Sequence, residues 1–119
     1  MLTCTNEITV SLNGQTSFET VTAMQGDSGS RRLNIRLTEN DIPFSVPAGT
    51  IARLFCRLPN KAKASCDCTV NSDGTITAAL SEAMLSIAGN IKLQVVLKYE
   101  DSTLSSVIFP VRVVPAMAR

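Results

Sequence analysis

Histidine, the commonest general base and transition-metal ligand in proteins, does not occur in this chain of 119 residues. Its absence also removes the usual partner of a serine or cysteine nucleophile. Carboxylates remain as candidate acids and bases. Most of them lie in segments typical of turns: Asp27, Glu39, Asp41, Asp73, Glu100 and Asp101. Because turn carboxylates usually bond to the neighbouring backbone, we expect a protein that is not an enzyme and has no cofactor.

The four cysteines are the other candidates for covalent or metal chemistry: Cys4, Cys56, Cys66 and Cys68. A Cys-x-Cys pair in a strand places both sulfurs on one face, where they do not pair readily with each other. A disulfide from Cys56 to one of that pair is conceivable, as is a four-thiolate zinc site. Zinc sites, however, usually present two cysteines separated by two to four residues, and Cys4 and Cys56 are isolated. We expect free, partly buried thiols that behave as small hydrophobes, with no metal.

Residues 26–30, Gly-Asp-Ser-Gly-Ser, carry the glycines and hydroxyls of a phosphate-binding loop and precede Arg31 and Arg32. A phosphate loop follows a strand, opens a helix and carries a lysine at a fixed position. Here a strand pattern follows the loop. The segment therefore predicts a structured turn.

A more informative pattern lies in residues 50–58, where two different sets of side chains alternate along the predicted strand. With Ala52, Leu54, Cys56 and Leu58 facing inward, the outward face carries a mixed apolar and basic set: Ile51, Arg53, Phe55 and Arg57. Aromatic and arginine side chains are enriched at the centres of protein contacts, so these four form a candidate protein-interaction face. A register shifted by one residue would place Phe55 in the core instead. The sequence leaves both registers open.

The elements that must position these residues repeat with a period of two, which predicts half-buried β-strands. The alternation is clearest at residues 91–99 and recurs at 7–12, 32–38, 75–80 and 104–114. Pro110 cannot donate a ladder hydrogen bond, so we expect an edge position or a bulge there.

Turn signals separate these runs, and Asp73-Gly74 between two strand patterns predicts a hairpin. Another turn is predicted at Asn13-Gly14. Only residues 81–86 look helical, with Ser81 as the N-cap and Gly89 beyond the end. We predict an all-β fold: an immunoglobulin-like antiparallel β-sandwich of about seven or eight strands with one short helix, forming a single domain over residues 1–119.

The charge and composition narrow the classes of partner. Eleven basic and ten acidic residues leave a net charge of +1, which gives no electrostatic footprint for nucleic acid or for an anionic membrane. Aromatic residues make up only 4%, so few rings are available to stack sugars. No apolar run is long enough for a membrane span and the N-terminus does not read as a secretion signal. We expect synthesis in a cytoplasm.

Several motifs follow one another in a characteristic order between residues 21 and 113. They are Gln25-Gly26-Asp27 leading to Arg31, then Leu37-Thr38-Glu39-Asn40, Pro47-Ala48-Gly49-Thr50, Leu58-Pro59-Asn60-Lys61 and Leu80-Ser81-Glu82-Ala83-Met84-Leu85. In this order the chain resembles the N-terminal domain of the phage baseplate upper protein family. Two family turns usually carry a glycine, in Leu-Thr-Asp/Glu-Asn-Gly and in Lys-Pro-Asp-Gly. This chain has Asp41 and Lys61 at those positions.

The resemblance implies a β-sandwich that docks on a virion and holds a receptor-binding fibre or tip protein. Family members usually continue into a linker and a fibre, whereas this chain ends at Arg119. We therefore expect a bacteriophage virion protein, made in the host cytoplasm, that serves as an adaptor or anchoring module at the baseplate or tail, or as a head-fibre or head-decorating protein. Its partners would be baseplate, tail or capsid proteins, met in multiple copies or as a homo-oligomer. The alternative is a stand-alone glycan-binding adhesin that uses the loops at residues 71–73 or 101–102.

Overall fold

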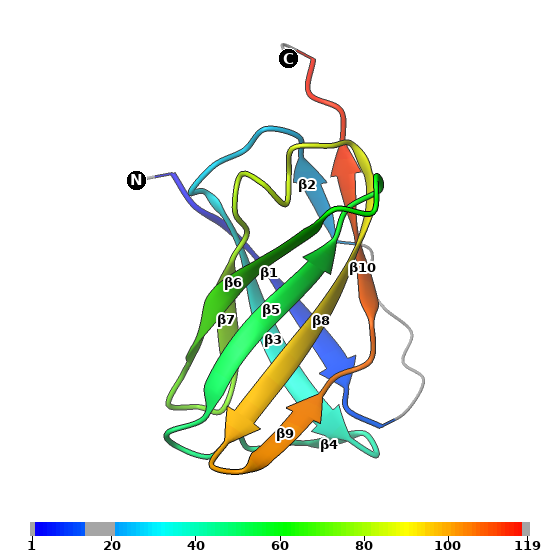
Figure 1. Ribbon diagram of the computed structural model, residues 1–119. Helices are drawn as coiled ribbons and strands as arrows, with labels where there is room; N and C mark the ends of the chain where they lie inside the picture. The colour runs from blue at the N-terminus through cyan, green and yellow to red at the C-terminus, as the bar shows by residue number, and fades with distance from the viewer. Residues whose placement is uncertain (1, 14–20, 118–119) are drawn as a thin grey trace.

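The computed structural model describes residues 2–13 and 21–117. These residues form ten β-strands and no helix, so the all-β prediction is confirmed (Figure 1). In chain order the strands are β1 (Cys4–Ser11), β2 (Thr22–Met24), β3 (Arg31–Glu39), β4 (Ile42–Pro43), β5 (Ile51–Arg57), β6 (Lys63–Val70), β7 (Ile76–Ala79), β8 (Gly89–Tyr99), β9 (Ser102–Ser105) and β10 (Phe109–Val114). The described part of the chain has no helix with the length and apolar character needed to cross a membrane.

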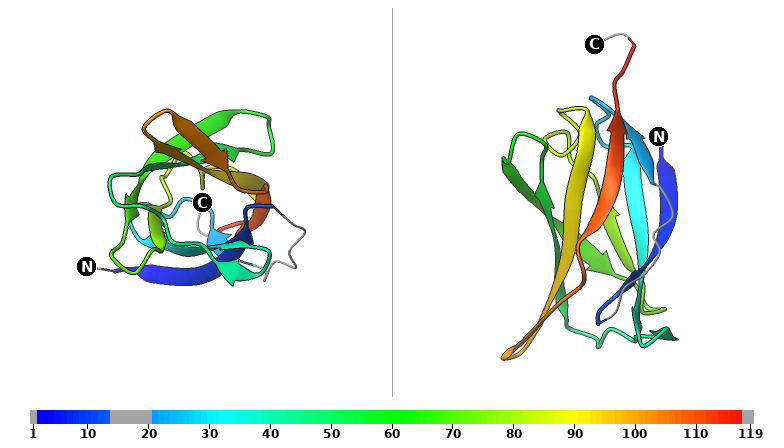
Figure 2. Two further views of the ribbon diagram at one scale, coloured as in Figure 1. Left: turned by 90° about the horizontal axis from the view of Figure 1, so that it is seen from below. Right: turned by 90° about the vertical axis from the view of Figure 1, so that its right-hand side faces the viewer.

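All ten strands belong to one curled sheet with the order β1-β3-β7-β6-β5-β8-β10-β2, to which β4 adds beside β3 and β9 beside β8. The sheet is mixed: β1 runs parallel to β3 and β2 runs parallel to β10, while the other pairs are antiparallel. Its two ends curl toward each other in a half-barrel, as Figure 2 shows in the view from below. The end of β1 is bonded to the segment before β10, where the Val107 N–H donates to the Ser11 carbonyl at 3.1 Å.

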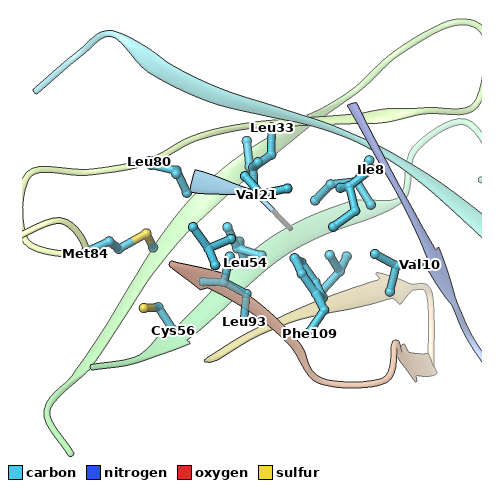
Figure 3. Close-up of a cluster of buried hydrophobic side chains, with 14 of the residues drawn as sticks. Ile8, Val10, Val21, Leu33, Leu54, Cys56, Leu80, Met84, Leu93 and Phe109 are labelled. Carbon is cyan, nitrogen blue, oxygen red and sulfur yellow. The ribbon is translucent and has the colours of Figure 1, made fainter. Parts of the chain in front are cut away.

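The core fills the inside of this curl. Leu33, Ile35 and Leu37 on β3 face it with 0 to 1% of their surface exposed. The alternating positions of β5, β7, β8 and β10 meet them from the other walls, with Leu54, Leu93 and Phe109 at the centre (Figure 3). Burying each large aliphatic or aromatic side chain contributes roughly 1.5–3 kcal/mol, which is why the period of two fixes which face of each strand points inward.

Three expectations about the fold need correction. Residues 81–86 form consecutive turns rather than a helix, because both Met84 and Leu85 are buried and the Leu85 carbonyl accepts from the Gly26 N–H at 2.8 Å. Strictly antiparallel pairing is wrong, since β1 and β2 pair in parallel. The immunoglobulin-like sandwich is not confirmed, because the strands follow one another around a single curled sheet.

At Pro110, β10 pairs with β8 only among the described residues, because its pairing with β2 begins at Arg112. This open side agrees with the expected edge position. The Arg112 N–H donates to the Val21 carbonyl at 2.9 Å, so the N–H of every second residue of β10 faces β2. Pro110 lies two residues before Arg112, where the β2 pairing begins. Its missing donor therefore breaks no ladder bond between β10 and either neighbour.

Two predicted turns are confirmed. Gly74, at φ 87°, lies in the hairpin that joins β6 to β7, where Asp73 Oδ1 accepts from the Thr75 N–H at 3.0 Å. The turn that ends in Arg31 is structured by an ion pair from Arg31 Nε to Asp27 Oδ2 at 2.8 Å. The predicted turn at Asn13-Gly14 lies partly outside the described residues.

Candidate interaction surface

Strand β5 supplies the candidate face, and the structure selects between its two registers. Ala52, Leu54 and Cys56 are buried. Phe55 is 44% exposed and Ile51 is 62% exposed on the opposite side of the strand. Arg53 and Arg57 also point outward. Phe55 is therefore a surface residue and not part of the core.

This face sits in the middle of a broad antiparallel ribbon, because β5 pairs with β6 on one side and with β8 on the other. Phe55 is flanked in register by Ser65 of β6 and Gln94 of β8. Figure 1 views the molecule from this outer side, with β5 and β8 in front and β1 and β3 behind. Because β6 and β8 both form ladder hydrogen bonds with β5, the backbone under these side chains is held rigidly.

Arg53 is held in place by its neighbours. Its guanidinium pairs with Asp67 Oδ1 at 2.8 Å and donates to Ser65 Oγ at 3.0 Å. It also lies over the Phe55 ring, with Cζ 5.9 Å from the ring centroid. The exposed ion pair contributes only about 0–1 kcal/mol to stability. The main effect of these contacts is to balance the charge of Arg53 and to cover one face of the Phe55 ring.

Arg57, at the end of β5, lies in a row of three cations. The strand register places it opposite Lys63 of β6 on one side and Lys92 of β8 on the other. All three side chains are exposed. Among the ion pairs of the described residues, none involves any of the three. This end of the ribbon therefore carries positive charge that the described residues do not balance.

A groove of about 400 Å³ runs across the ribbon between Phe55 and this row. One wall is formed by Phe55, Gln94 and Ile108, and the other by Lys63, Arg57 and Lys92. Cys56, Ala64 and Leu93 lie beneath it. Because the side chains of Cys56 and Leu93 point into the core, the floor between the walls is largely backbone. Gln94 Nε2 donates to the Ser106 carbonyl at 3.0 Å, which fixes the middle of the apolar wall.

The strand pattern alone did not identify Lys63, Lys92 and Ile108 as parts of this surface. The alternation at residues 91–99 already places Lys92 on the polar face of its strand. The turn at Pro59-Asn60 makes Lys63 a cross-hairpin neighbour of Arg57. The missing information was the pairing of β5 with β8, which joins segments far apart in sequence.

The four cysteines are free thiols: Cys4 is exposed, Cys56 is buried, and Cys66 and Cys68 are half-buried. As predicted, Cys66 and Cys68 share one face of β6. Burial raises the pKa of the Cys56 thiol to about 11. The hydrogen bond between the Cys66 and Cys68 thiols lowers the pKa of Cys66 and raises the pKa of Cys68. In the described residues no group of three or more histidine, cysteine, aspartate or glutamate side chains is placed to hold a metal ion.

The turn carboxylates behave as expected for turn formers where the structure records their contacts. Asp27 pairs with Arg31, and Asp73 Oδ1 accepts from both the N–H and the hydroxyl of Thr75. These bonds lower the pKa of Asp73. The contacts of both carboxylates are local and order the backbone of their own turns.

The curled mixed sheet and its exposed outer ribbon are the features of an all-β structural domain. A family model described as the BppU N-terminal domain, that of the baseplate upper protein, matches residues 4–119. The chain therefore belongs to the baseplate upper protein N-terminal domain family.

Solved structures share this fold. The chain is similar to one described as the N-terminal domain of phage TP901-1 ORF48, with a TM-score of 0.76 and 15% sequence identity over 92% of this chain and 97% of that one. At this identity the likeness shows the fold alone. No curated protein sequence matches the chain.

Family membership confirms the resemblance seen in the order of the turns. A baseplate family places the protein in the virion, gives it a structural role and implies association with other virion proteins.

Proposed function

We propose that this protein is a non-enzymatic adaptor that anchors a receptor-binding fibre or tip protein to the phage particle, and that residues 1–119 act as one domain. The outer face of β5, with Ile51, Arg53, Phe55 and Arg57, is the proposed attachment surface. The observation that carries the proposal is the exposure of Phe55 and Ile51 on a rigid, doubly paired strand. Aromatic and arginine side chains on such a surface favour protein contact. We place the adaptor at the baseplate rather than at the head because the family is that of a baseplate protein.

The size of the surface suits this role. The seven residues of β5 extend over about 23 Å at ~3.3 Å per residue, and four adjacent strands at ~4.8 Å add a width of about 19 Å. Such a patch covers about 440 Å² in outline, about half of what each partner buries in a standard-sized contact, so it can form the centre of one. Several copies in the particle would add avidity to a contact of this size.

Of the two loops suggested for the glycan-binding alternative, the one at residues 71–73 offers little to a sugar. Asn71 Nδ2 donates to Thr75 Oγ1 at 3.0 Å and to Thr77 Oγ1 at 2.8 Å, while Asp73 accepts from Thr75. The side chains of Asn71 and Asp73 thus bond within the hairpin. On the outer ribbon, Arg53 covers one face of the Phe55 ring on which a sugar would stack. These contacts favour the adaptor over the adhesin.

A binding assay with purified baseplate, tail and capsid proteins of the same phage tests the proposal. The full chain is immobilised as the wild type, as Phe55→Asp and as Ile42→Asp. Ile42 is the matched control because it is an apolar residue, 67% exposed, on β4 away from the ribbon. We expect the wild type and Ile42→Asp to capture the same virion protein and Phe55→Asp to bind about tenfold or more weakly, with an unchanged circular dichroism spectrum. Equal capture by folded Phe55→Asp would contradict the proposal.

A further inference from the structure

The side chains that line the groove of the outer ribbon indicate which kind of partner segment the groove would bind. Lys63, Arg57 and Lys92 stand side by side on three neighbouring strands. Like charges directly opposite each other destabilise a sheet. No acidic side chain of the described residues pairs with any of them, whereas Arg53, one row away, is paired with Asp67. The row is therefore a surface that an anionic ligand would stabilise.

The second wall is apolar. Phe55 and Ile108, exposed by 44% and 58%, face the cations across the groove. Successive outward rows on a strand are about 6.6 Å apart, so one extended chain fits between the walls. From β6 across β5 and β8 to the chain entering β10, the groove spans about 14 Å at ~4.8 Å per strand, the length of about four extended residues.

An extended segment that lies flat in this groove directs its side chains alternately to the two walls, because side chains alternate along a strand. Every second side chain would meet Phe55 and Ile108, and the others would meet the cations. The complementary sequence therefore alternates apolar residues with aspartate or glutamate.

We infer that the groove binds an extended segment of another virion protein in which acidic and apolar residues alternate. This inference rests on the proposed docking function and specifies the chemistry of the partner. An acidic polysaccharide is disfavoured as the occupant because Ile108 has no ring on which a sugar could stack and only Phe55 has one. Arg53 already covers one side of the Phe55 ring.

The test uses the full chain and an eight-residue synthetic peptide that alternates glutamate and leucine. A lysine and leucine peptide is the control probe, and alginate represents an acidic polysaccharide. The variant K63E/K92E reverses the row, and K61E/K98E makes the same charge change outside the groove. Lys98 is the matched control on β8, since it lies on the same face of that strand, beside Ile51.

We expect the glutamate peptide to shift the amide resonances of Phe55, Arg57 and Gln94 in the wild type and in K61E/K98E. The wild type should bind this peptide more tightly at low salt than at high salt. K63E/K92E should bind the glutamate peptide about tenfold or more weakly than the wild type. The same variant should be no less thermally stable than the wild type, because Arg57 would then lie between opposite charges. Equal binding by K63E/K92E, equal binding of the lysine peptide, or preferential binding of alginate at these residues would each overturn the inference.

The purified virion proteins separate this inference from the docking proposal. If the wild type captures a virion protein and K63E/K92E captures it equally well, the acidic-segment inference fails and docking stands. If the wild type captures none of them, the docking proposal fails whatever the peptide does.

Discussion

Lys61 lies at a position where the backbone favours glycine. It is in the turn between β5 and β6 with φ at 70°, in the left-handed region that favours glycine. A side chain in the left-handed region costs about 1–2 kcal/mol, against about 0.5–1 kcal/mol of extra unfolded-state entropy for glycine. The Lys61 N–H bonds to the Leu58 carbonyl at 2.9 Å, which a glycine retains. We therefore expect Lys61→Gly to stabilise the fold by about 0.5–1 kcal/mol.

The assay is thermal unfolding followed by circular dichroism. Unfolding entropy of about 2.1 cal/mol/K per residue converts this gain into a Tm rise of about 2–4 °C for a chain of 119 residues. Lys61→Ala is the matched control, because it removes the same charge and side chain but keeps the Cβ atom. It should not raise Tm. If Lys61→Ala stabilised the protein as much as Lys61→Gly, charge or side-chain entropy and not backbone strain would be the cause, and the reasoning would be refuted.

Three further outcomes follow from the core, the buried thiol and the β6–β7 hairpin. Phe109→Ala should lower the unfolding free energy by about 3–5 kcal/mol in urea because Phe109 is fully buried, while exposed Met117→Ala should change it by less than about 0.5 kcal/mol; similar losses would place the core elsewhere. Because burial raises the pKa of Cys56 from 9.0 to about 11, the unfolded chain loses this proton first and stability should fall as pH rises from 9 toward 11. Cys56→Ala should weaken that alkaline loss in urea titrations, and an unchanged pH dependence would be inconsistent with a buried thiol. Because hydrogen bonds from Thr75 lower the pKa of Asp73 below 3.8, their stabilising effect should disappear as pH falls through that range. Asp73→Asn should flatten the acid side of the stability curve, and a curve as steep as that of the wild type would argue against the bonded carboxylate.

The alternation of side chains predicted which face of a strand is buried, and the structure agrees in β3 and β8. The reason is local: a shift by one residue would expose the whole apolar set of a strand. At β5 the alternation alone allowed either face to be outward. The pairing of β5 between β6 and β8 then placed Leu54 in the core and Phe55 outside.

Pairing partners were harder to predict than faces. β1 pairs in parallel with β3, and β2 pairs in parallel with β10. The side-chain period is two in both parallel and antiparallel sheets, so the alternation does not distinguish the two kinds of pairing. The expected helix at residues 81–86 failed because its local propensity competes with tertiary contacts. Met84 and Leu85 are both drawn into the core, and the Leu85 carbonyl bonds to Gly26.

The candidate site was half visible in the sequence. Ile51, Arg53, Phe55 and Arg57 come from one strand, so periodicity was enough to group them. The groove needs Lys63, Lys92 and Ile108 as well, and only the curled sheet places β6, β8 and the start of β10 beside β5. The order of turns could be seen in the sequence because each turn depends on a few local residues.

The most direct test of the central claim is a cryo-electron microscopy reconstruction of the phage particle that carries this protein. The account predicts that another virion protein covers the outer face of β5, with Phe55 at the contact and an extended segment between Phe55 and the row of Lys63, Arg57 and Lys92. A reconstruction in which that face is open to solvent while the protein is attached through other strands would contradict it.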